Sequence, residues 1–184
     1  NLIWLVRDEL TELEELARLS SAEKRERIVR NAQQLVGDAY YWGGRSPLAV
    51  PATDRVTGVD CSALVNLAYR TVGMTIPRDA HEQFLRARRV KTPQLADLIF
   101  LSERDNPRKI VHVMLYAGDE EVLEGPGTGL AVRRISLLHR LGRPLVRLTN
   151  GTVVEGQTVY FGRYVHDYNL IRWVAAPVLR ASSY

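Results

Sequence analysis

The spacing of apolar residues along the chain changes near residue 95. Of all features of the sequence, this change most restricts the folds that the chain can adopt. Before that point apolar residues recur at helical spacings, as in "SSAEKRERIVRNAQQLV" from Ser20 and in the stretch after Cys61. After it, short apolar runs such as "ADLIFL" from Ala96 and "VHVMLYAG" from Val111 are typical of strands. Helices followed by a mostly antiparallel sheet predict an α+β fold.

Local signals predict where several of these elements begin. Ser20 and Glu23 form a capping-box pattern, which predicts a helix start. A second helix is expected over residues 62–72, and a short third one is expected to be capped by Asp79. Later strands are expected at "EEVLEG", "LAVRRISL", "TVYFGRYV" and "LIRWVAAP", with the first two joined as a hairpin by "GPGTG".

The length of 184 residues suits a single domain with a sizeable core. The chain opens with "NLIWLVRDEL" rather than with Met, so we interpret it as a processed product or a fragment. "LIWLV" reads as the last strand of an upstream piece. We therefore expect residues 1–20 to be a linker or the remnant of an upstream accessory segment, and residues 21–184 to form the folded domain.

Composition excludes several classes of function. The net charge of +4 suits an anionic partner, but the basic residues are scattered and form no aromatic-studded stripe, so nucleic-acid binding is not expected. No apolar run approaches the roughly 18 residues that span a bilayer, so the chain is not expected to cross a membrane. Its single cysteine excludes an internal disulfide and a multi-thiolate metal site.

That cysteine, Cys61, lies where a loop turns into a helix, and two interpretations are open for it. It is either a small core residue or a nucleophile, because the positive end of a helix favours a thiolate. His112 lies in a strand with strongly apolar neighbours. Since ionisable groups are seldom buried without a partner, it is either a core histidine with a hydrogen bond or a base that lines a cleft.

Five short motifs occur in an order that resembles the NlpC-type cysteine peptidases, papain-like enzymes that cut peptidoglycan stem peptides. They are "YYWGG" from Tyr40, "VDCSALV" around Cys61, "IPRDAHEQ" from Ile76, "ADLIFL" from Ala96 and "VHVMLYAGDEEVLEG" around His112. The resemblance covers residues 28–135 and implies a papain-like fold, with the nucleophile at a helix N-terminus packed on the sheet. Residues 140–184 fall outside it and are expected to be a family-atypical C-terminal extension.

The resemblance also implies a catalytic triad. Cys61 matches the nucleophile and His112 the general base of the family. The position that orients the imidazole lies 12 residues after the base and is Glu124 here, where the family usually has His. A carboxylate can orient an imidazole and stabilise its charged form. The other interpretation of Glu124 is an exposed hairpin carboxylate.

Further site residues follow from the same resemblance. Tyr40 matches a tyrosine whose hydroxyl lies near the oxyanion, with Tyr41 as the competing candidate, and Trp42 belongs to a turn that walls the cleft. Ser62 matches a substrate-contacting residue. Asp60 would oppose a neighbouring thiolate, so we expect its carboxylate to point toward substrate or a backbone N–H.

Asp79 has two competing roles. In the subgroup that resembles γ-D-glutamyl-L-diamino-acid endopeptidases, the matching Asp holds the free amine of the N-terminal L-Ala, a charge-assisted contact. Its position also suits a helix N-cap, and one side chain cannot serve both roles well.

The function expected from the sequence is hydrolysis of the γ-D-glutamyl to diamino-acid bond of peptidoglycan stem peptides, with no metal or other cofactor. The alternatives are a papain-like acyltransferase or amidase with another substrate, and a cell-wall binding module that has lost catalysis. The expected partner is peptidoglycan or a muropeptide. The expected location is the bacterial cell envelope or the medium, or the cytoplasm if the protein recycles muropeptides.

Overall fold

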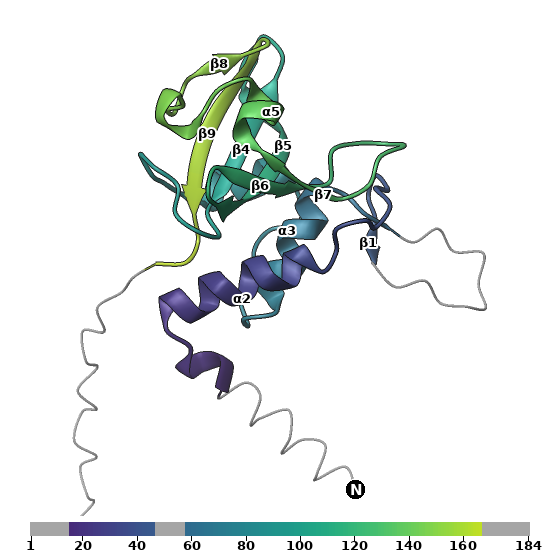
Figure 1. The fold of residues 1–184 in the computed structure, drawn as a ribbon, viewed down its shortest axis with the longest axis vertical. Coiled ribbons are helices and arrows are strands. Elements are labelled where there is room, and N and C mark those ends of the chain that lie inside the picture. Colours follow the sequence, from purple (N-terminus) through teal and green to yellow (C-terminus); the bar gives the residue numbers. More distant parts are fainter. Residues whose placement is uncertain (1–14, 47–57, 167–184) are drawn as a thin grey trace, which may run out of the picture.

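The structure of the protein, a computed structural model, describes residues 15–46 and 58–166 (Figure 1). The strands expected at "LIWLV" and "LIRWVAAP" lie outside the described residues. So does most of the long loop that precedes Cys61.

Helices α2, α3 and α4 precede the main part of the sheet in the chain, and residues 15–18, before α2, are also helical. α2 (Ser21–Gln33) begins with the predicted capping box, in which the Ser20 side chain accepts from the Glu23 N–H and the Glu23 side chain accepts from the Ser20 N–H. α3 (Cys61–Arg70) starts one residue earlier than predicted, and α4 (Ala80–Arg86) is short.

The sheet is antiparallel throughout, with strand order β3-β9-β4-β5-β6-β7 and with β8 paired to β9. The predicted hairpin around "GPGTG" is confirmed as β6 and β7. The strands are β3 (Arg88–Arg89), β4 (Leu98–Glu103), β5 (Asn106–Gly118), β6 (Glu121–Glu124), β7 (Arg133–Ser136), β8 (Val153–Val154) and β9 (Gln157–Arg163). Three small elements complete the described fold: the pair β1 (Arg45–Ser46) and β2 (Gly58–Val59), helix α5 (Leu137–Leu141) and the 3₁₀ turn η1 (Leu145–Arg147).

Alternation along the strands builds a core on each face of the sheet. On β4, Leu98 and Phe100 pack with residues of α2 and α3, whereas Ile99 and Leu101 pack on the opposite face, which α5 covers (Figure 1). Both faces of β4 are therefore buried, which explains its continuous apolar run "LIFL". The predicted α+β class and papain-like arrangement are confirmed.

An ion cluster fastens α2 to the sheet. The Asp97 carboxylate, which is fully buried, accepts hydrogen bonds from Arg25 of α2 at 3.1 Å and from Arg163 of β9 at 2.6 to 3.0 Å. β9 lies between β3 and β4, so part of the stretch 140–184 that falls outside the family resemblance forms an inner strand.

Candidate active site

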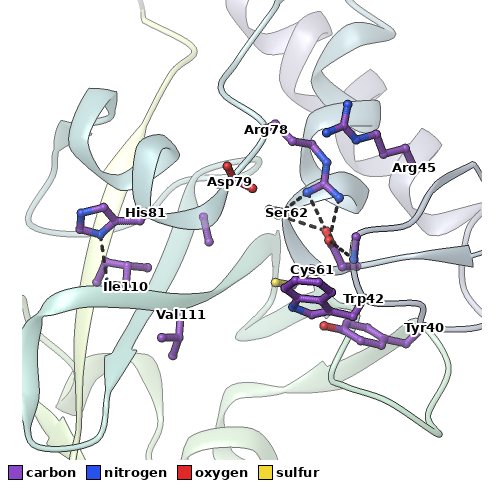
Figure 2. Close-up of a pocket in the computed structure, with 13 residues that line it drawn as sticks. Tyr40, Trp42, Arg45, Cys61, Ser62, Arg78, Asp79, His81, Ile110 and Val111 are labelled. Carbon is purple, nitrogen blue, oxygen red and sulfur yellow. Dashed lines mark hydrogen bonds and ion pairs between the residues drawn. The ribbon is translucent and has the colours of Figure 1, made fainter.

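Cys61 is the first residue of α3, and the residue before it caps the helix. Asp60 has an extended backbone, and its side chain accepts a hydrogen bond from the Ala63 N–H at 2.8 Å. Asp60 rather than Cys61 is therefore the N-cap, which accounts for the early start of the helix. The thiol lies at the positive end of the helix, where an anion is favoured, and it lines a cleft (Figure 2).

His112 and Glu124 come together from neighbouring strands. Nε2 of His112, on β5, lies 2.8 Å from Oε2 of Glu124, on β6. The second ring nitrogen is left for Cys61, with which the imidazole shares a side-chain hydrogen bond. The structure thus brings the three residues of the expected triad into one chain of hydrogen bonds.

These contacts change the protonation of both side chains. Burial alone would lower the pKa of His112, but hydrogen bonds to Cys61 and Glu124 and the charges of both raise it to about 9. Burial would raise the pKa of Glu124, but the hydrogen bond and charge of His112, together with Arg140, lower it to about 2. The geometry therefore favours an imidazolium beside an ionised carboxylate.

Glu124 is fully buried, so the exposed-hairpin interpretation is wrong. Besides His112 it contacts two guanidinium groups. Arg133 donates from Nε and Nη2 at 3.0 and 2.7 Å, and Arg140 donates from Nε at 2.9 and 3.0 Å. Sequence reasoning missed both arginines, although Arg133 lies directly opposite Glu124 across the predicted hairpin.

Tyr40, rather than its neighbour Tyr41, lines the cleft with Cys61. A bridge to Val59 places Tyr40 beside the start of α3. Burial raises the pKa of Tyr40, as do the negative charges of Cys61 and Asp60, so its hydroxyl keeps its proton and can donate it.

Two neighbours of Tyr40 shape the mouth of the cleft. Trp42 is 80% exposed there. Gly43 follows with a φ of +77°, a conformation that glycine tolerates and other residues resist. This agrees with the expected turn beside the cleft.

Asp60 is held away from the thiol by a network on its other side. Arg78 donates to its two oxygens at 3.0 and 2.7 Å, and Gly43 donates its N–H at 3.0 Å. The Ser62 hydroxyl donates to Asp60 at 3.1 Å and accepts from Arg78 at 2.8 Å. Burial would raise the pKa of Asp60, but the hydrogen bonds, above all that of Arg78, lower it. The expectation that its carboxylate faces a backbone N–H is correct.

Arg78 belongs to the same network, a role that was not predicted from the sequence. Its guanidinium joins Asp60, Ser62 and the Gly44 carbonyl, and it also lines the cleft (Figure 2). The available signal was its position in "PRDA", next to an Asp that was already a candidate.

Asp79 occupies the N-cap position of α4, but its side chain makes no capping hydrogen bond. The carboxylate is exposed and lines the cleft (Figure 2). Of the two roles expected for it, only the one in the cleft is open to its side chain in this structure.

The cleft has a volume of about 280 Å³ and gathers residues from several elements. Its far wall includes His81 of α4 and the β5 residues Ile110 and Val111 (Figure 2). Nδ1 of His81 accepts the Ile110 N–H at 3.2 Å, a contact that the sequence did not suggest. In the described part of the chain, no group of three or more His, Cys, Asp or Glu side chains could hold a metal ion.

The model of the NlpC/P60 family matches residues 37–141, which is more than half of the chain. The chain belongs to the NlpC/P60 family. Within residues 15–46 and 58–166 of this NlpC/P60 protein, no helix has the length and apolar character that crossing a bilayer requires.

Three curated relatives illustrate the family. The bifunctional muramidase/DL-endopeptidase CwlT of Bacillus subtilis is 30% identical over 57% of this chain and 30% of its own length. The peptidoglycan endopeptidase RipB of Mycobacterium tuberculosis is 33% identical over 61% of this chain and 48% of its own length. The gamma-D-glutamyl-L-lysine dipeptidyl-peptidase of Bacillus subtilis is 30% identical over 61% of this chain and 36% of its own length. The chain thus spans less than half the length of each.

Solved structures share the fold. RipB from Mycobacterium tuberculosis matches with a TM-score of 0.60 and 28% identity, over 82% of this chain and 71% of that one. RipA has been solved with mutations at a cysteine, a histidine or a glutamate. Each matches with a TM-score of 0.58 and 25% identity, over 79% of this chain and 64% of that one. In that series the glutamate follows the histidine by the same 12 positions that separate His112 from Glu124.

Proposed function

We propose that this NlpC/P60 protein is a cysteine endopeptidase that hydrolyses the γ-D-glutamyl to diamino-acid bond of peptidoglycan stem peptides. The observation that supports this most is the hydrogen-bonded chain from Cys61 through His112 to the buried Glu124, beside an open cleft. Names of the relatives support it too, because they include peptidoglycan endopeptidases and a γ-D-glutamyl peptidase.

In the proposed reaction, the Cys61 thiolate attacks the carbonyl carbon of the γ-amide. Donors for the resulting oxyanion are the backbone N–H of Cys61, in the first turn of α3, and the Tyr40 hydroxyl. The His112 imidazolium gives its proton to the leaving amine as the carbon–nitrogen bond breaks, which leaves a thioester on Cys61. His112 then takes a proton from water, which attacks the thioester and releases the glutamyl carboxylate.

This proposal is tested by mass spectrometry of L-Ala-γ-D-Glu-diaminopimelate after incubation with the wild type and with Cys61→Ala. We expect the wild type to release L-Ala-D-Glu and the variant to release none. An intact peptide with the wild type, or full hydrolysis by Cys61→Ala, would contradict the proposal.

The two other functions predicted from the sequence give different outcomes in the same experiment. An acyltransferase would pass the acyl group to an added amine or alcohol in preference to water. A binding module would retain the peptide without change, and its cysteine would react with chloroacetamide no faster than a small free thiol.

We also propose that Asp79 binds the free ammonium group of the N-terminal L-Ala. Its carboxylate lies in the cleft and is not used to cap α4. A charge-assisted hydrogen bond to an ammonium would be stronger than a neutral one. The name of one relative, a dipeptidyl-peptidase, denotes an activity that starts from a free amino terminus.

Acetylating the N-terminus of the test peptide removes the charge that Asp79 would bind. We expect acetylation to lower kcat/KM at least tenfold for the wild type and to have little effect on Asp79→Asn. Glu82→Gln is the matched control, because Glu82 lies in the same helical turn but outside the cleft. Equal hydrolysis of both peptides by the wild type would contradict the role of Asp79.

A requirement for a free amino terminus would place the reaction after an amidase that detaches the stem peptide from its glycan. We propose the cell envelope or the medium as the site of action, since an amidase that detaches stem peptides from the polymer would supply the substrate there. Free stem peptides recycled in the cytoplasm would present the same chemistry.

A further inference from the structure

Arg133 and Arg140 hydrogen-bond to the Glu124 carboxylate so that only one of its oxygens faces His112. Oε1 accepts from Nε and Nη2 of Arg133 and from Nε of Arg140. Oε2 accepts from Nε of Arg140 and from Nε2 of His112. Since a carboxylate offers about four acceptor sites, the arginines occupy the positions that the imidazole does not use.

Each arginine is placed by its own element. Arg133 lies directly opposite Glu124 in the pairing of β6 with β7. Arg140 lies in the last turn of α5, a helix that begins at the Ser136 cap and ends at Gly142 with a φ of +67°. Two elements that contribute nothing else to the cleft therefore converge on one carboxylate.

The charges of this cluster differ in how they titrate. Glu124 faces His112 from β5, Arg133 from β7 and Arg140 from α5, while Cys61 on α3 faces the other side of His112. A guanidinium stays charged throughout the working pH range. An adjacent arginine lowers the pKa of a carboxyl group by about 1 to 3 units. The arginines therefore keep Glu124 ionised at pH values where an unpaired buried carboxyl would take up a proton.

Partial exposure of the arginines argues against a purely space-filling role. The side chains of Arg133 and Arg140 are 42% and 22% exposed, whereas that of Glu124 is fully buried. Shortening either arginine opens its site to water and leaves no dry cavity. The group that depends on them is the buried carboxylate.

We propose that Arg133 and Arg140 are positioning residues that hold the Glu124 carboxylate ionised and in one orientation, so that a single oxygen always faces His112. This inference rests on the proposed function, in which His112 exchanges protons with Cys61 and substrate. Neither arginine touches the reacting atoms, and each acts through Glu124.

The pH dependence of Cys61 alkylation tests the proposal without a substrate. The chain has one cysteine, so iodoacetamide labelling reports on that thiol alone. The variants are Arg133→Gln and Arg140→Gln. The matched control is Arg134→Gln, which removes the same charge from the adjacent position of β7, where Arg134 pairs with the surface residue Glu121 at 2.6 Å.

We expect the acid limb of the alkylation profile to move up by about one pH unit or more in both variants and to stay in place in Arg134→Gln. A protonated Glu124 no longer stabilises the imidazolium, and the thiolate is lost with it. In peptide hydrolysis, kcat should fall about tenfold with little change in KM, because the imidazole is less well placed. Lysine at either position should restore the alkylation limb but not all of kcat, since it lacks the planar fork of arginine.

Three outcomes would overturn the proposal. One is an unchanged alkylation profile in both variants, and another is an equal shift in Arg134→Gln, which would indicate general surface charge. The third is a lower Tm with an unchanged profile, which would indicate a structural role alone. If the wild type cleaves no stem peptide, the proposed function fails, while the alkylation arm still decides the role of the arginines.

Discussion

At the scale of single residues, His112 combines two properties that rarely occur together. It lies in an apolar strand with a side chain only 12% exposed, yet its charged form is favoured. Anionic partners on both sides of the ring, Cys61 and Glu124, outweigh the cost of burial. The sequence left two interpretations of His112, a hydrogen-bonded core histidine and a base that lines a cleft. Both apply, because the histidine is largely buried and hydrogen-bonded and also adjoins the cysteine of the cleft.

The pKa of His112 predicts how activity and stability depend on pH. Because it is raised from 6.5 to about 9, the stabilisation from the charged form is complete below pH 6.5 and is lost as the pH rises through 9. We expect kcat/KM for hydrolysis to fall above pH 9, where the imidazolium proton is gone. Alkylation of Cys61 should not fall there, since the thiolate persists.

Both rates are measured across pH 7 to 10.5 on the same preparation. In the same range, the stability advantage of the wild type over His112→Gln should disappear. Hydrolysis that stays constant to pH 10.5 would show that the imidazolium is not the proton donor.

At the scale of elements, the end of β6 serves two parts of the site at once. Glu124 contacts His112, and the next residue, Gly125, packs against α3. A Cβ atom built at Gly125 would lie 3.3 Å from the backbone nitrogen of Cys61 and 3.2 Å from the Tyr40 ring. These are the residues that carry both proposed oxyanion donors, so the absence of a side chain at Gly125 lets the strand end approach them.

Gly125→Ala should therefore lower activity more than stability. We expect kcat to fall about tenfold, because the methyl group displaces the Cys61 amide or Tyr40 by a few tenths of an ångström. Gly129→Ala is the matched control in the same loop, since it has a φ of +81° and nothing within 4 Å. It should lose about 1 kcal/mol of stability through backbone strain and keep its kcat.

Comparing kcat with Tm for the two variants separates these effects. Full activity in Gly125→Ala would contradict the role assigned to this contact.

Sequence patterns predicted the elements well and the contacts between distant elements poorly. The capping box at Ser20, the hairpin and the strand of His112 follow from local spacing, so they could be read directly. The partners of Glu124 could not, because Arg133 depends on hairpin register and Arg140 on a helix that follows the last of the five motifs. The two interpretations of Asp79 could not be separated from the sequence, because they depend on whether its side chain caps α4 or lies in the cleft.

At the scale of the whole molecule, Asp97 joins parts that are far apart in the chain. It binds Arg25 from α2 and Arg163 from β9, across 72 and 66 residues, and all three side chains are buried. Arg25 also donates to the carbonyl oxygens of Leu95 and Val165. One carboxylate thus links α2 to an inner strand of the sheet.

Asp97→Asn should be strongly destabilising, because it removes the negative charge that Arg25 and Arg163 share in the core. We expect a loss of about 3 to 5 kcal/mol in the free energy of unfolding, measured by denaturant titration. Glu103→Gln is the control, since the exposed pair of Glu103 with Lys109 should matter little. Equal stability of the two variants would contradict this account of the cluster.

The position of β9 late in the chain affects how the protein folds during its synthesis. As a nascent chain leaves the ribosome, every residue assigned to the site, up to Arg140, emerges before Gln157–Arg163. Until those residues follow, one edge of β4 has no partner and Asp97 lacks Arg163. Completion of the described sheet, and with it the ordered setting of the proposed triad, therefore waits for translation to pass β9, which delays the appearance of the proposed thiolate hydrolase during synthesis.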